Sequence, residues 1–304
     1  MTAGALSDRP KGFGASLRTM LEMIKIEHTL FALPFAFLGM ILAAEGWPSW
    51  PVVGWIVVAM VGARSAAMGF NRLVDHRIDA ENPRTADRAL PAGEVSPPAV
   101  SLFVLASAGL MVLAAWRLNP LALWLSPVAL VILLGYSYTK RFTWAAHLVL
   151  GLALSGAPLG AWIAVRGEWP AGAAWALAGA VLLWTAGFDV LYALQDRDFD
   201  RQRGLFSIPA RFGVRGALVI SALLHLAMLG LLAWLPTLYT SAGGPALGWA
   251  YWLGFAGCCV LLAYQHAVVR PNDLSRLGPA FFQANAALSL WLFAATAVDI
   301  LFAL

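Results

Sequence analysis

The chain has 304 residues, of which 61% are hydrophobic and only 12% are charged. A soluble domain of this length carries about 25% charged residues, so the composition excludes an ordinary soluble protein and favours a polytopic membrane protein. The net charge of +4 is modest, and the distribution of the basic residues along the chain explains it without a nucleic-acid partner.

Apolar segments of bilayer length, about 20 residues each, occupy nearly the whole chain after a polar N-terminal segment, residues 1–20. Backbone polar groups cannot remain unpaired in lipid, so each segment is expected to be helical. We therefore predict an all-α, polytopic membrane protein that forms a single membrane domain over residues 1–304. The nine predicted transmembrane spans are 21–44, 51–73, 98–116, 120–138, 143–165, 171–194, 214–236, 246–269 and 279–303.

The basic residues are distributed very unevenly between the connections. If the N-terminus is cytoplasmic, seventeen of the 20 Lys and Arg residues fall on the cytoplasmic side. Only Arg117 and Arg166 fall outside, and Arg64 lies within a span. This positive-inside pattern predicts a multi-pass protein of the inner membrane with a cytoplasmic N-terminus.

The two long connections, residues 74–97 and 195–213, follow the second and sixth spans and would both face the cytoplasm. Each begins with two aspartates four residues apart, Asp75 and Asp79 in the first and Asp196 and Asp200 in the second. Long ordered loops are usually functional. The sequence therefore predicts an active site that opens to the cytoplasmic side.

The first charged patch, "NRLVDHRID", continues the second span. At about 100° per residue, a helix places Asn71, Asp75 and Asp79 on one face. Arg64 lies seven residues before Asn71, on the same face and deeper in the membrane. We expect Asn71 and Arg64 to contact the ligand. Alternatively, Asn71 could cap the helix, and Arg64 could pair with Asp75 or Asp189.

The second patch, "DVLYALQDRDFD", follows the sixth span. On a continuous helix Asp189, Asp196 and Asp200 share a face, with Tyr192 beside it. Asp189 and Arg64 lie within apolar segments, where ionisable residues are costly and usually functional. The alternative for Asp189 is a buried ion pair with an arginine.

Carboxylate clusters without His or Cys at ligand spacing favour Mg²⁺, which binds one or two carboxylates and completes its shell with phosphate and water. Neighbouring arginines suit phosphate oxygens. We therefore predict a diphosphate held through Mg²⁺ by Asn71, Asp75, Asp79, Asp196 and Asp200, with ion pairing to loop arginines as the alternative. The histidines at 147, 225 and 266 have no partner at ligand spacing, and we expect them to be structural.

These two patches are similar to the paired signatures of the UbiA superfamily of intramembrane prenyltransferases, N-x-x-x-D-x-x-x-D and D-x-x-Y-x-x-x-D-x-x-x-D. The stretches "RSAAMGFNR", "YSYTKRFT" and "SIPARFG" also resemble that family, and the resemblance covers essentially the whole chain. The opening "KIEHTLFALPFAFLG" resembles the 4-hydroxybenzoate polyprenyltransferase-like branch. Many members have Asp where this chain has Arg72, so one possible metal ligand is missing here.

The resemblance implies nine helices around a central cavity and Mg²⁺-dependent transfer of a polyprenyl group from polyprenyl diphosphate to an aromatic acceptor. The acceptor would be 4-hydroxybenzoate or a related aromatic acid of ubiquinone or menaquinone biosynthesis. The alternatives are haem-, chlorophyll- or dihydroxynaphthoate-type members of the same superfamily and, from another class, an ion-coupled transporter.

The resemblance also implies roles for individual side chains. The expected catalytic residues are Asp75, Asp79, Asp189, Asp196, Asp200 and Arg64. The expected diphosphate-binding residues are Arg72, Lys140, Arg141 and Arg211. The expected acceptor- or cation-binding residues are Lys25, Arg64 and Tyr192. Lys25, Lys140 and Arg141 could instead be ordinary interfacial anchors, and Tyr192 could simply pack.

Overall fold

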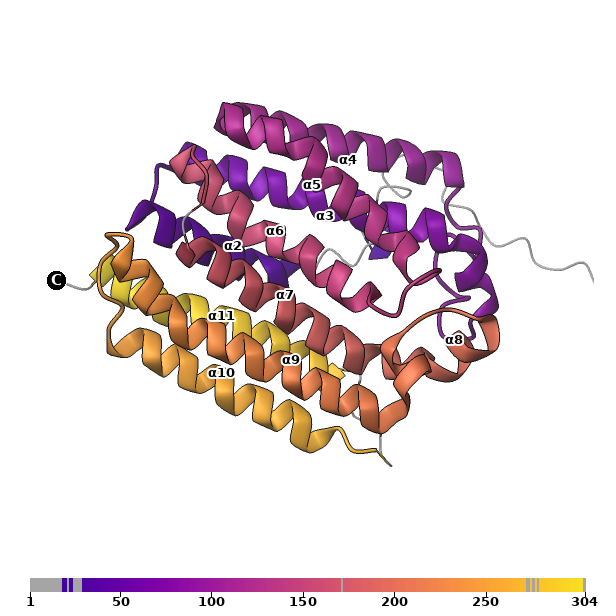
Figure 1. Ribbon diagram of the computed structural model, residues 1–304. Coiled ribbons are helices and arrows are strands. Elements are labelled where there is room, and N and C mark those ends of the chain that lie inside the picture. Colours follow the sequence, from indigo (N-terminus) through magenta and orange to yellow (C-terminus); the bar gives the residue numbers. More distant parts are fainter. Residues whose placement is uncertain are drawn as a thin grey trace, which may run out of the picture.

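The computed structural model describes residues 18–20, 22–23, 29–170, 172–271, 274, 277 and 279–302, which are predominantly helical (Figure 1). Within this part of the chain, eight helices are long and apolar enough to cross a membrane, and residues 32–44 form a shorter apolar helix. These nine elements correspond to the nine predicted spans, of which the first begins in a region only partly described. The predicted all-α, polytopic fold is confirmed.

The helices begin and end close to the predicted boundaries, with α3 and α9 extending furthest beyond them. The helices are α2 (Thr29–Ala44), α3 (Trp50–Glu81), α4 (Pro97–Leu118), α5 (Pro120–Thr139), α6 (Ala146–Arg166), α7 (Gly172–Tyr192), η2 (Ala193–Asp196), α8 (Arg197–Arg203), α9 (Ile208–Ser241), α10 (Trp249–Val268) and α11 (Pro279–Phe302).

The long helices lie side by side (Figure 1). Helices α3, α4 and α5 form one side of the bundle, α9, α10 and α11 form the other, and α2, α6 and α7 lie between them. Helix α3 packs extensively on α4, and α7 packs on both α6 and α9. The short helix α8 lies at one end of the bundle, which is the end that carries both charged patches.

Helices α6 and α7 approach each other backbone to backbone at Gly151. A β-carbon at this position would lie 2.3 Å from the carbonyl oxygen of Leu182, so only glycine fits without a shift of the backbone. This contact holds the first turns of α6 close to the second half of α7.

The core between α7 and the C-terminal helices contains buried polar groups that are satisfied across helices. Trp184 packs 4.9 Å from Phe35, measured between ring centroids, and donates its indole N–H to Asn285 Oδ1 at 2.9 Å. His225 Nδ1 on α9 lies 2.9 Å from His266 Nε2 on α10. Two of the three histidines that were expected to be structural therefore contact each other.

The second patch departs from a regular α-helix. Asp189, Asp196 and Asp200 do not lie on one continuous α-helix, because the 3₁₀ turn η2 separates α7 from α8. A 3₁₀ turn has three residues per turn, yet Asp189, Asp196 and Asp200 all line the same cavity, as the predicted shared face requires. The first patch does continue a regular helix, since α3 runs unbroken to Glu81.

Candidate active site

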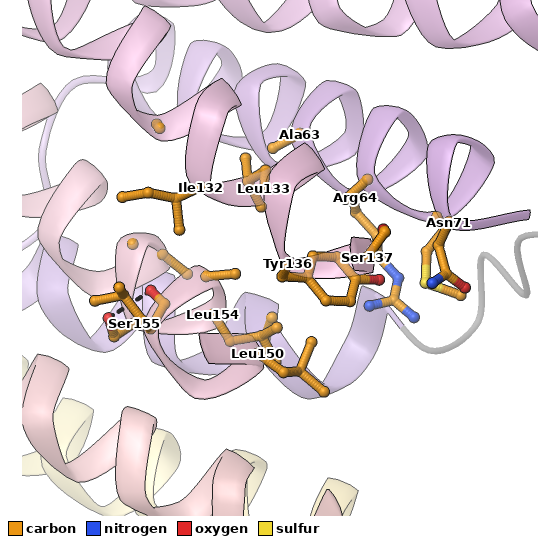
Figure 2. A pocket seen from close by; sticks show the side chains of 18 of the residues that line it. Ala63, Arg64, Asn71, Ile132, Leu133, Tyr136, Ser137, Leu150, Leu154 and Ser155 are labelled. Atoms are coloured by element: carbon orange, nitrogen blue, oxygen red, sulfur yellow. Dashed lines mark hydrogen bonds between the residues drawn. The ribbon is translucent and has the colours of Figure 1, made fainter. Parts of the chain in front are cut away.

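A cavity of about 750 Å³ lies between α3, α5, α6 and α7. Its walls are mostly apolar along α5 and α6, where Ile132 and Leu154 are among the lining residues (Figure 2). It becomes polar where α3, η2 and α8 meet, and Figure 2 shows Arg64 and Asn71 toward that side of the apolar walls. One polar mouth on a long apolar cavity suits a ligand with a charged head and a hydrocarbon tail.

The structure brings most of the predicted site residues to this one cavity. Its lining includes Arg64, Asn71, Arg72, Asp75, Asp79, Lys140, Asp189, Tyr192, Asp196 and Asp200. Arg141 is not part of the lining but bonds to a residue that is. Lys25 lies outside the described residues.

Asp75 is buried near the end of α3 and is held by cations from the end of α5. Lys140 Nζ donates to Asp75 Oδ2 at 2.6 Å, and Arg141 Nη2 lies 3.4 Å from Oδ1. Asn71, one helical turn earlier, donates its amide to Oδ2 at 3.1 Å. The predicted sharing of a face by Asn71 and Asp75 is therefore observed as a direct contact.

Asp79, one turn further along α3, is also buried and faces two arginines. Arg88, from the loop after α3, donates to Asp79 Oδ2 at 2.7 Å. Arg72 Nη1 lies 3.5 Å from the same oxygen, and its side chain is only 9% exposed. The residue that follows Asn71 in the motif is thus a buried cation that pairs with the second aspartate of the motif.

Asp196, at the end of η2, is bound by the loop after α3. Asn82 donates to Asp196 Oδ1 at 3.0 Å, and Arg84 donates from Nε to the same oxygen at 2.8 Å and from Nη2 to Oδ2. The Arg84 guanidinium also reaches the hydroxyl of Tyr192 at 3.2 Å. Burial alone would lower the pKa of Arg84, but its hydrogen bonds to Asp196 outweigh burial and raise the pKa above its usual value.

Asp189 has a partner that sequence spacing did not reveal. His147 Nδ1, in the first turn of α6, lies 2.6 Å from Asp189 Oδ2 on α7. The partner that the structure gives Asp189 is thus a histidine, whereas the alternative expected from the sequence was an arginine. The backbone N–H of Ile208, the first residue of α9, donates to His147 Nε2 at 3.2 Å.

Arg211, expected to bind diphosphate, lies away from the cavity. Its guanidinium carbon is 5.7 Å from the ring centroid of Trp144 and 5.5 Å from that of Phe212. These contacts are cation–π interactions at an exposed site. Arg211 is not among the residues that line the cavity.

Four residues of the site were not predicted from the sequence: Asn82, Arg84, Arg88 and His147. The first three lie in "NPRTADR", where the local pattern indicates a loop rich in arginine but does not say which arginine turns inward. The signal for His147 is its place just after "YSYTKRFT", at the start of an apolar span.

The donor chemistry of the mouth fits Mg²⁺ shared with a phosphate ligand. Within the described residues, no three His, Cys, Asp or Glu side chains converge as a ready-made metal site. Asp75, Asp79 and Asp196 are each engaged by Lys or Arg instead. Carboxylate and amide oxygens are suitable Mg²⁺ ligands, and this ion typically takes only one or two carboxylates with substrate phosphates.

The family follows from a direct match of the sequence. Residues 32–293 match the UbiA prenyltransferase family. The chain belongs to this family. It is a prenyltransferase of the UbiA family, as the motifs predicted.

Curated relatives of this UbiA-family chain span nearly its whole length. It is 35% identical over 269 residues to the 4-hydroxybenzoate octaprenyltransferase of Vibrio vulnificus (strain CMCP6), with 88% of this chain and 91% of the relative covered. It is 36% identical over 281 residues to the enzyme of the same name from Vibrio cholerae serotype O1, with 91% and 89% covered.

Solved structures agree with the fold. An apo UbiA homolog from Aeropyrum pernix K1 is 35% identical to this chain and superposes with a TM-score of 0.80. The match covers 91% of this chain and 99% of the homolog. A UbiA homolog from Archaeoglobus fulgidus, solved with GPP and Mg²⁺ bound, gives a TM-score of 0.71 at 19% identity, with 93% of this chain and 99% of that chain covered. The second likeness concerns the fold alone.

Proposed function

We propose that this UbiA-family prenyltransferase transfers a polyprenyl group from polyprenyl diphosphate to 4-hydroxybenzoate or a related aromatic acid of quinone biosynthesis. The observation that carries the proposal is the meeting of both aspartate motifs at one mouth of a long apolar cavity. The hydrocarbon tail would occupy the apolar part, and the diphosphate would lie at the mouth. The names of the 35–36% identical relatives support this choice of acceptor.

Asp75, Asp79, Asp196 and Asp200 would hold Mg²⁺ together with the diphosphate, and Asn71 would add a polar ligand. When bound, Mg²⁺ supplies positive charge that stabilises the leaving diphosphate. The chain's own cations would support the same task. The carboxylates now bind Lys140, Arg84 and Arg88. When the aspartates bind the metal instead, each of these cations would turn toward phosphate oxygens.

The group transfer would be an electrophilic aromatic substitution. The allylic C–O bond breaks and its electron pair leaves with the diphosphate. The π electrons of the aromatic ring form the new C–C bond to the prenyl carbon, and the ring then loses a proton to a base. Tyr192 lines the cavity, and its ring faces the guanidinium carbon of Arg84 5.4 Å from the ring centroid. Once Arg84 turned toward the diphosphate, this ring face would stabilise the allylic cation, and the apolar walls would exclude water that otherwise traps it.

The test of this proposal uses purified protein in detergent or nanodiscs. With Mg²⁺, a polyprenyl diphosphate and 4-hydroxybenzoate, we expect a prenylated aromatic acid by mass spectrometry and release of one diphosphate per product. EDTA should stop both, and added Mg²⁺ should restore both. Absence of any prenylated product across donors of several chain lengths and a panel of aromatic acids would refute the proposal.

The same panel separates the alternatives. Product formed only with haem, a chlorophyll precursor or dihydroxynaphthoate would keep prenyl transfer but replace the acceptor. Ion uptake into vesicles without diphosphate release would instead favour a transporter. Both aspartate motifs lie at one mouth of the cavity, whereas transporters place binding charges near the bilayer midplane, so the enzyme is favoured.

We further propose that the protein resides in the inner membrane with the charged mouth on the cytoplasmic side. The support is the bias of basic residues. In a variant without Cys258 and Cys259, an impermeant thiol reagent added outside intact cells should not label cysteines placed at the exposed positions Glu94 or Gln202. It should label a cysteine at Ala246, which lies at the other end of the bundle. External labelling of either of the first two positions would reverse the orientation.

A further inference from the structure

The contact between His147 and Asp189 connects the first turn of α6 to the wall of the cavity. Both residues line the cavity, but His147 is buried, with 4% of its surface exposed, whereas the Asp189 side chain is 25% exposed. We propose that His147 is a positioning residue that holds the Asp189 carboxylate in the orientation needed for prenyl transfer. This inference rests on the proposed function.

The hydrogen-bond partners of His147 decide which ring nitrogen carries its proton. The backbone N–H of Ile208 can only donate, so Nε2, at 3.2 Å, must be the acceptor. The proton of a neutral imidazole then resides on Nδ1, which lies 2.6 Å from Asp189 Oδ2 and donates to it. His147 therefore accepts a hydrogen bond from the first residue of α9 at Nε2 and donates one to the Asp189 carboxylate from Nδ1.

The surrounding backbone keeps this contact in place. The close approach of Gly151 to Leu182 fixes α6 against α7 one turn beyond His147. Ile208 is fully buried and begins α9, and Ser207 caps that helix by accepting from the N–H of Ala210. Because Ile208 is held on the other side of the ring, the imidazole is fixed at both nitrogens.

The location of Asp189 explains why its orientation would matter. It lies on α7, deeper along the cavity than Asp196, on the side where the allylic cation and the aromatic ring must meet if the diphosphate lies at the mouth. A carboxylate there can stabilise the developing cation or accept the ring proton. Hydrogen bonds that orient metal-ligating side chains are typically worth about 10- to 100-fold in activity, and we expect an effect of the same order for Asp189.

Three substitutions separate the two hydrogen bonds. His147→Leu removes both. His147→Asn keeps an N–H at the place of Nδ1 but has no acceptor at the place of Nε2, whereas the longer amide of His147→Gln can supply one donor and one acceptor. If His147 positions Asp189, kcat should fall about 10- to 100-fold in the Leu variant and recover in the Asn and Gln variants, with KM for the polyprenyl diphosphate unchanged.

A purely structural role predicts another pattern. If the contact with Ile208 alone mattered, thermal stability would fall in the Leu and Asn variants while kcat per folded molecule stayed at the wild-type value in both. That outcome would overturn the inference, as would an Asn variant as slow as the Leu variant.

A second measurement does not depend on activity. Nitrogen-15 NMR of histidine-labelled protein in lipid, with His147 assigned by difference from His147→Leu, should show a neutral ring protonated at Nδ1. A ring protonated at Nε2, or an imidazolium, would contradict the inference even if the proposed reaction were correct. If the wild type showed the ring protonated at Nδ1 but no prenyl transfer, that result would count against the proposed function alone.

Discussion

Asp75→Asn and Asp196→Asn should each lower the turnover of prenyl transfer by at least about 100-fold, because charge stabilisation of the leaving group by a bound metal contributes several kcal/mol. Both changes keep the shape of the side chain and remove one negative charge. They also release the cations that the carboxylates now hold, Lys140 from Asp75 and Arg84 from Asp196. The measurement is product formation at matched amounts of folded protein.

Asp198→Asn is the matched control. It lies two residues from Asp196, but its side chain is 71% exposed and pairs only with Arg197 among the contacts described. Its activity should equal that of the wild type. Stabilisation against heat by Mg²⁺ and inorganic diphosphate should be lost in the Asp75 and Asp196 variants and kept in the Asp198 variant. Wild-type turnover in either of the first two would remove these carboxylates from the mechanism.

The helical framework could be predicted because each span must satisfy its own backbone in lipid. The contact between Asn71 and Asp75 could be predicted for the same reason, since regular α-helical spacing fixes which side chains share a face. The second patch is less regular than predicted, although its three aspartates still line one cavity. A 3₁₀ turn at 193–196 interrupts the helix, and its sequence, "ALQD", contains neither Gly nor Pro to mark it.

Contacts between residues far apart in the chain could not be predicted from the sequence. Arg84 meets Asp196 across 112 residues of chain, and His147 meets Asp189 across 42. Both pairings depend on how helices pack, which in turn depends on close approaches such as that of Gly151 to Leu182. A single sequence shows which residues have suitable chemistry, whereas packing decides which of them reach one another. For that reason Arg84 enters the site and Arg211 does not.

Arg64→Ala should lower kcat/KM for the aromatic acid by roughly 100-fold, which corresponds to about 3 kcal/mol for a lost charged hydrogen bond. Arg64 lies seven residues before Asn71 on α3, about 10 Å deeper at 1.5 Å per residue. Its side chain lines the cavity, and Figure 2 shows it extending toward Tyr136. A guanidinium at that depth is costly unless it faces a polar ligand or partner, and the carboxylate of an aromatic acid is such a ligand.

Arg64→Lys tests the geometry of the interaction. Lysine keeps the charge but loses the planar fork that binds a carboxylate through two hydrogen bonds, so it should impair catalysis nearly as much as alanine does. Arg117→Ala is the control, since Arg117 lies outside the cavity lining with its guanidinium carbon 5.4 Å from the ring centroid of Trp55. An Arg64→Ala variant that folds and uses the aromatic acid with wild-type kcat/KM would assign Arg64 to structure and place the acceptor elsewhere in the cavity.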